Sequence, residues 1–199
     1  MVKISTLLVV IAVLLQECVG WLPRKKQPQG GQHLINAGNA LKAAAEVLDG
    51  STLNYSRNYY HAYPQLLREA GESLSLAGEA WTADNWGAVT YAADDCSFHF
   101  QALSQVQQQA AMQRVYKGAS GELSAVAGIR ESICDDGTNG ANPNNAAAPN
   151  LAALSQFLIE AAVISEKLNK DTNESDTVAF LKSLRAAAKS IDALAKEED

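Results

Sequence analysis

Residues 85–116 read NWGAVTYAADDCSFHFQALSQVQQQAAMQRVY, and the spacing of their apolar side chains decides the fold class. A spacing that alternates between three and four residues lays one apolar stripe along an α-helix. The stripe here consists of Trp86, Val89, Ala93, Cys96, Phe100, Leu103, Val106 and Ala110. The stretch therefore predicts one long helix, ending at Lys117 and Gly118, whose striped face packs inside a helical bundle.

Alanine-rich segments predict further helices on both sides of this stretch. Runs such as LKAAAEVL and LRAAAKSIDAL contain alanine, which has the best helix propensity, and aromatic residues make up only 7% of the chain. We expect additional helices at about 33–48, 64–83, 120–134, 150–168 and 176–196. The predicted fold is all-α, an up-and-down four-helix bundle with an N-terminal helical extension and an extra C-terminal helix.

The first twenty residues have the composition of a secretory signal peptide. Lys3 precedes a mostly apolar run from Ile4 to Leu15, and small residues follow up to Gly20. We expect cleavage after Gly20 and a secreted, extracellular protein without a membrane anchor. The predicted organisation is a signal peptide at 1–20, a flexible leader at 21–32, a helical bundle at 33–170 and an additional amphipathic helix at 171–199.

Two further segments bear on surface chemistry. The sequons at Asn54 and Asn173 are candidate glycosylation sites in a secreted chain. Residues 135–150, DDGTNGANPNNAAAPN, are rich in Gly, Asn and Pro and predict a loop. A calcium site is not expected there, because Ala146 stands where a calcium loop needs a bidentate glutamate.

The residues YAADDCSFHF, 91–100, contain side chains that could serve a metal site or a thiol nucleophile. Helical spacing brings Cys96 and His99 near each other, but a zinc site needs more His or Cys ligands than the chain supplies. No nucleotide-binding loop, Cys-x-x-Cys pair or His-Glu-x-x-His motif is present in the sequence. We expect no metal, no cofactor and no catalysis, with a small hydrolase or metalloenzyme using Cys96 and His99 as a minor alternative.

A disulfide between Cys96 and Cys134 is the favoured interpretation of the two cysteines that remain after signal cleavage. Disulfides form readily in secreted proteins. A turn at 117–120 between two antiparallel helices would bring both cysteines to one end of the bundle. Closing a loop of this length contributes roughly 4 kcal/mol in the chain-entropy model.

Charge excludes one class of partner. The chain has 16 Lys and Arg against 22 Asp and Glu, a net charge of −6. Nucleic-acid binders normally carry a basic face, so we expect no nucleic-acid partner. An acidic surface suits a basic partner, although it also favours solubility alone.

The order of the cysteine-bearing helices resembles the plant invertase and pectin methylesterase inhibitor family. VTYAADDCSFHFQALSQV, GELSAVAGIRESICDDG and NLAALSQFLIEAAVISEKL are similar to the second, third and fourth helices of that family. Cys96 with Phe100, and Ser124 with Cys134, match the family's cysteine patterns. The resemblance covers roughly residues 33–168 and lacks the N-terminal disulfide of family members.

The resemblance implies a protein inhibitor that blocks the substrate cleft of an enzyme in a 1:1 complex. The family's Pro-Lys-Phe motif of invertase inhibitors is absent, which favours a pectin methylesterase as the target in the cell wall, with an invertase as the alternative. The expected contact residues are the outward polar positions of the second and third helices, Ser97, Gln101, Gln105, Gln108, Arg130 and Glu131. A secreted helical carrier of apolar ligands is the alternative from another class.

Overall fold

The computed structural model describes residues 30–50, 62–135, 143–170 and 174–197. They form six helices and no strand: α2 (Gly30–Gly50), α3 (Ala62–Thr82), α4 (Trp86–Val106), α5 (Ala110–Asp135), α6 (Pro143–Leu168) and α7 (Glu174–Glu197). The prediction of an all-α helical bundle is confirmed. The predicted signal peptide, most of the leader, and the sequons at Asn54 and Asn173 lie outside the described residues.

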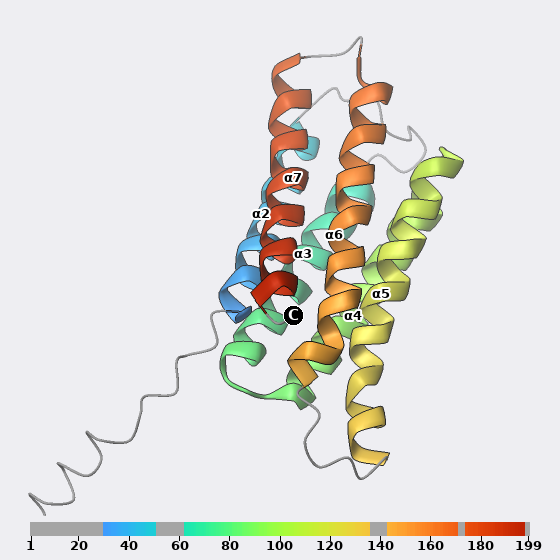
Figure 1. Ribbon diagram of the computed structural model, residues 1–199. Helices are drawn as coiled ribbons and strands as arrows, with labels where there is room; N and C mark the ends of the chain where they lie inside the picture. Colours follow the sequence, from blue (N-terminus) through green and yellow to red (C-terminus); the bar gives the residue numbers. More distant parts are fainter. Residues whose placement is uncertain (1–29, 51–61, 136–142, 171–173, 198–199) are drawn as a thin grey trace, which may run out of the picture.

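The six helices run alternately up and down and form a closed ring (Figure 1). Each helix packs against its neighbours in the chain, and α7 packs against both α6 and α2. The connections at 83–85 and 107–109 are so short that the helices they join must run antiparallel. At the closure of the ring, His33 Nε2 in α2 lies 3.0 Å from Glu197 Oε1 in α7.

The C-terminal helix is a full member of this ring. Its residues Leu181, Leu184 and Ile191 are buried, and the Ser155 hydroxyl of α6 donates to the carbonyl of Ala188 at 3.0 Å. The predicted additional C-terminal helix is therefore part of the bundle. Six helices share the core, so a four-helix bundle with an N-terminal helical extension and an extra C-terminal helix does not describe the packing.

The helix predicted at 85–116 is two helices, and this difference matters for the site. Gln107 has extended backbone, φ −81° and ψ 136°, and ends α4, whereas α5 runs straight through Gly118. A Cβ at Gly118 would lie 2.4 Å from the ring of Phe157 in α6. The glycine therefore allows α5 and α6 to approach closely, and the predicted turn at 117–120 is wrong.

The loop predicted at 135–150 is shorter than expected, because α6 begins at Pro143. Proline is tolerated in a first helical turn, where its missing N–H has no partner to lose. Among the described helices, α6 alone is long and apolar enough to cross a membrane by length and composition. In the bundle, 44% of its most apolar 18-residue window is buried.

Glycines bring α2 and α3 into backbone contact. A Cβ at Gly38 would lie 2.3 Å from the Gly71 carbonyl oxygen, and a Cβ at Gly31 would lie 2.3 Å from that of Gly78. Both helices repeat glycine after seven residues, so the two pairs lie on facing sides of an antiparallel contact. Any side chain at these positions would push the helices apart.

The predicted apolar stripes are buried in most positions. On α4 the confirmed residues are Val89, Ala93, Cys96, Phe100 and Leu103. Tyr63 of α3 is also buried, being 3% exposed. Val178 of α7 is 57% exposed.

Candidate functional site

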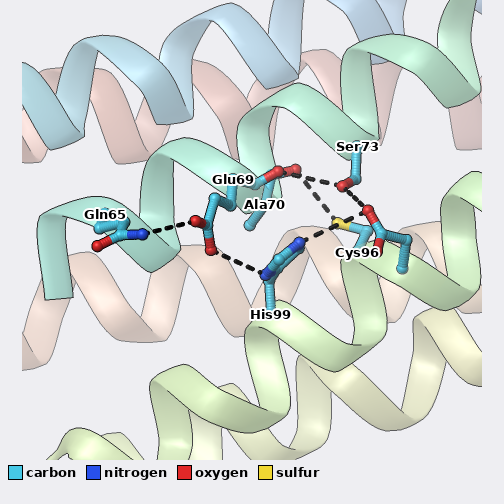
Figure 2. Close-up of polar contacts among 7 residues, drawn as sticks. Gln65, Glu69, Ala70, Ser73, Cys96 and His99 are labelled. Atoms are coloured by element: carbon cyan, nitrogen blue, oxygen red, sulfur yellow. Dashed lines mark hydrogen bonds and ion pairs between the residues drawn. The ribbon is translucent and has the colours of Figure 1, made fainter. Parts of the chain in front are cut away.

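The residues that suggested chemistry lie in the contact between α3 and α4 (Figure 2). Helix α4 contributes Asp95, Cys96 and His99, and α3 contributes Glu69 and Ser73. Because residues three and four apart share a helix face, these side chains converge on one stretch of the contact. Whether they form a reactive site depends on which side chain bonds to which.

The Cys96 thiol is buried and bonded to backbone. Its sulfur donates to the carbonyl oxygen of Ala70 at 3.3 Å. Burial raises the pKa of the Cys96 thiol well above its ordinary value, and the Asp95 carboxylate raises it further. A thiol nucleophile requires a lowered pKa and access to substrate, so Cys96 is suited to packing instead.

The predicted disulfide between Cys96 and Cys134 is absent, since Cys96 is a free cysteine. The Ser97 hydroxyl donates to the carbonyl oxygen of Ser120 at 2.9 Å, which sets α4 against α5 at this level. Cys134 lies fourteen residues further along α5, about 21 Å at 1.5 Å per residue. A disulfide needs Cα atoms within roughly 7 Å. The pairing depended on a turn at 117–120, and the turn lies at 107–109.

His99 lies between two carboxylates and is 15% exposed. Its Nδ1 lies 3.3 Å from Glu69 Oε2, within ion-pair distance but without hydrogen-bond geometry, and its Nε2 lies 3.5 Å from Asp95 Oδ2. The Ser73 hydroxyl donates to Asp95 rather than to His99. In a Ser-His-Asp triad the histidine lies between the serine and the acid and takes the proton of the serine. Here Ser73 bonds to the acid, so His99 is not placed to take its proton.

The other bonds of this cluster are those of a structural contact. Gln65 donates to Glu69 Oε1 at 2.9 Å, and Ser73 also contacts the Glu69 carbonyl at 3.1 Å. Among the described residues no group of three or more His, Cys, Asp or Glu side chains could hold a metal ion. The cluster therefore connects α3 to α4 through polar bonds.

The residues predicted to contact a partner differ in their exposure. Ser97 was expected to point outward but is 5% exposed, and its hydroxyl lies 2.7 Å from that of Ser124. It is buried because α4 has a neighbour on each side, α3 and α5. Gln101 is half-buried and Gln105 exposed on α4, whereas Gln108 is exposed in the connection to α5. The side chains of Arg130 and Glu131 lie outside the described part of the chain.

A groove of about 300 Å³, lined by residues with polar or charged end groups, lies between α4 and α5 beside their connection. Ser104, Gln105, Gln113, Arg114 and Lys117 line it. The Gln113 amide donates to the Gln107 carbonyl at 2.6 Å, which fixes one wall. The sequence analysis missed the three α5 residues because it assigned them to the end of the preceding helix. Lys117 lies three residues after Arg114 and four after Gln113, and these spacings indicate a shared helix face.

Comparison with protein-family models, with curated proteins and with solved structures found no match to this chain.

Proposed function

We propose that the protein is a secreted inhibitor without catalysis of its own, which binds a cell-wall carbohydrate-active enzyme in a 1:1 complex. The first candidate target is a pectin methylesterase, and an invertase is the alternative. The observation that supports this proposal is the groove between α4 and α5 with its glutamine, arginine and lysine side chains. The sequences of these two helices resemble the second and third helices of the inhibitor family, from which that family's contacts come.

The side chains of the groove suit an enzyme surface that binds sugars. Gln105 and Gln113 each offer an amide donor and an acceptor, as sugar hydroxyls do. Arg114 and Lys117 add two cations that would pair with carboxylates of a partner. Polar, partly wet interfaces of this kind bind specifically without a large apolar patch.

The test is titration of the purified protein against a pectin methylesterase and an acid invertase. Inhibition of the first at a stoichiometry of one supports the proposal. The double variant Gln101→Ala/Gln105→Ala truncates a glutamine of the groove and the glutamine one turn before it on α4. Each hydrogen bond to the partner that is lost is worth about 1 kcal/mol, or roughly a fivefold rise in the inhibition constant. Gln156→Ala, an exposed glutamine on α6, is the matched control and should leave inhibition unchanged.

The carrier of apolar ligands is the second candidate, because an open groove of about 600 Å³ lies between α2 and α7. Its lining residues include Ala40, Ala43, Val47, Ala179 and Lys182. Failure to inhibit either enzyme, together with uptake of a fluorescent fatty acid that Ala43→Glu abolishes, would favour the carrier over the inhibitor.

A further inference from the structure

The outward side of α3 and α4 exposes three large apolar side chains. Leu76 is 57% exposed, Tyr91 78% and Phe98 69%. Tyr91 and Phe98 are seven residues apart, which puts them on one side of α4 about 10 Å from each other along the helix axis. Single exposed apolar residues are ordinary, but two aromatic rings on one helix face call for an explanation.

Leu76 lies at the level of Tyr91. The bond between Ser73 and Asp95 aligns the two antiparallel helices. Leu76 is three residues beyond Ser73 on α3, and Tyr91 is four residues before Asp95 on α4, so both lie about one turn from that bond. Leu76 and Tyr91 therefore lie at the same level on neighbouring helices, and Phe98 lies two turns further along α4.

Acidic residues occur along both helices and in the connection between them. The segment from Glu69 to Gln113 contains six acidic residues and no Lys or Arg. Its formal charge of −6 equals the net charge of the whole protein. We name these six and the three apolar residues the acidic–aromatic face: Glu69, Glu72, Leu76, Glu79, Asp84, Tyr91, Asp94, Asp95 and Phe98.

The acids of this face have no lysine or arginine partner in the described part of the chain. In the described ranges, no Lys or Arg lies within ion-pair distance of its six acids, and His99 is the basic group beside Glu69 and Asp95. Some acids elsewhere on the described surface do have a basic partner, as Glu166 has in Arg185 at 2.8 Å. Rigid aromatic rings amid uncompensated acids complement a surface that is both apolar and basic.

We propose that the acidic–aromatic face binds a basic amphipathic helix of a partner protein. Tyr91 and Phe98 serve as the apolar anchors, since exposed rings that become buried contribute most to an interface. The acids pair with lysines and arginines that flank the partner's apolar stripe, and they accelerate encounter. This surface is separate from the groove of Gln113, Arg114 and Lys117, and the inference does not depend on the proposed inhibition.

A labelled amphipathic helix of leucine and lysine tests the proposal, with its scrambled sequence as the control for charge alone. Fluorescence anisotropy of the full-length mature protein should show that the amphipathic peptide binds at least about tenfold more tightly than the scrambled one. Binding should weaken with salt, because exposed charges are screened.

Variants separate the two halves of the face. Tyr91→Ala/Phe98→Ala should raise Kd for the amphipathic peptide at least about tenfold. Glu72→Gln/Asp94→Asn should raise it about threefold at low salt and flatten the salt dependence. Ile159→Ala/Val163→Ala, an exposed apolar pair of α6, is the matched control and should leave Kd unchanged.

Two outcomes would overturn the proposal. Equal binding of both peptides with no effect of the aromatic variant would reduce the face to a solvated acidic surface. Self-association of the protein in sedimentation, removed by Tyr91→Ala/Phe98→Ala, would show that a second copy covers the face.

Discussion

The hydroxyl oxygens of Tyr63 and Tyr116 lie 2.6 Å apart in the core and join α3 to α5. Their rings meet edge to face with centroids 6.1 Å apart, and Phe100 of α4 lies against Tyr116 at 6.0 Å. α3 and α5 flank α4 in the ring, so the tyrosine pair connects helices across its interior. This contact offers a direct measure of how well the interior is packed.

Removing one hydroxyl should destabilise the protein measurably. Tyr116→Phe removes the bond to Tyr63 and should lower the free energy of unfolding by about 1 kcal/mol. Urea unfolding of Tyr116→Phe, Tyr63→Phe and the double variant gives the coupling energy, which should be about 0.5–1.5 kcal/mol. A coupling near zero would mean that the hydroxyls do not bond in solution.

The same pair predicts loss of stability at alkaline pH. Burial raises the pKa of Tyr116 to about 12, although the hydrogen bond from Tyr63 lowers it in part. Burial, then the charge of Tyr116 and the hydrogen bond to it, raise the pKa of Tyr63 well above its usual value. In the unfolded chain tyrosine loses its proton near pH 10, whereas these two keep it in the folded state.

The folded state therefore binds more protons than the unfolded state above pH 10, and stability falls there. The stability that depends on the two protonated tyrosines should be fully present below pH 10. Between pH 10 and 12 the free energy of unfolding should decline by about 1.4 kcal/mol per pH unit for each tyrosine. Urea unfolding at pH 9, 10, 11 and 12 measures the slope. The variant Tyr63→Phe/Tyr116→Phe should lose most of it, and an unchanged slope would assign the effect to other groups.

Glycine substitution should distinguish close helix packing from helix propensity. Gly38→Ala places a methyl group 2.3 Å from the Gly71 carbonyl, so α2 and α3 must separate. We expect a loss of about 1–3 kcal/mol, the usual cost of overpacking. Thermal unfolding of this variant measures the loss.

Gly121→Ala in α5 is the matched control, because a Cβ there meets no atom of another helix or of a nearby side chain within 4 Å. Alanine is the better helix former, so this variant should be more stable by about 0.5–1 kcal/mol. Equal effects of the two substitutions would contradict the backbone contact between α2 and α3.

Periodicity in the sequence identified which residues are buried but not which helix they contact. The stripe correctly placed Cys96 and Phe100 in the core, because a 3.6-residue period reports one buried face. Ser97 was misplaced because each helix of the ring has two flanking neighbours, and a small polar side chain bonded to Ser120 packs well between them. Apolar patterning carries no signal for such a position.

The position of one turn accounts for the error in the site. Glutamines at 107–109 have good helix propensity, so nothing in the local sequence separates α4 from α5. In the sequence, Gly118 is typical of a helix end. In the structure it lies inside α5 and leaves room for the ring of Phe157. The turn was predicted about ten residues too late, and Cys134 was therefore expected next to Cys96. The same error assigned Arg114 and Lys117 to the wrong helix, so the groove that they line was not predicted.

The free thiol of Cys96 leads to the last prediction. Protein prepared without residues 1–20 contains two cysteines, Cys96 and Cys134, and it should show two thiols per chain when unfolded without a reducing agent. In a Cys134→Ser variant, Cys96 should react with a thiol reagent only on unfolding, because it is buried and donates to Ala70. A reducing agent should change the free energy of unfolding by less than about 0.5 kcal/mol, whereas loss of a disulfide across this loop would cost roughly 4 kcal/mol. No reactive thiol in the unfolded, unreduced protein would instead establish a Cys96–Cys134 bond and require α4 and α5 to pack in a different register.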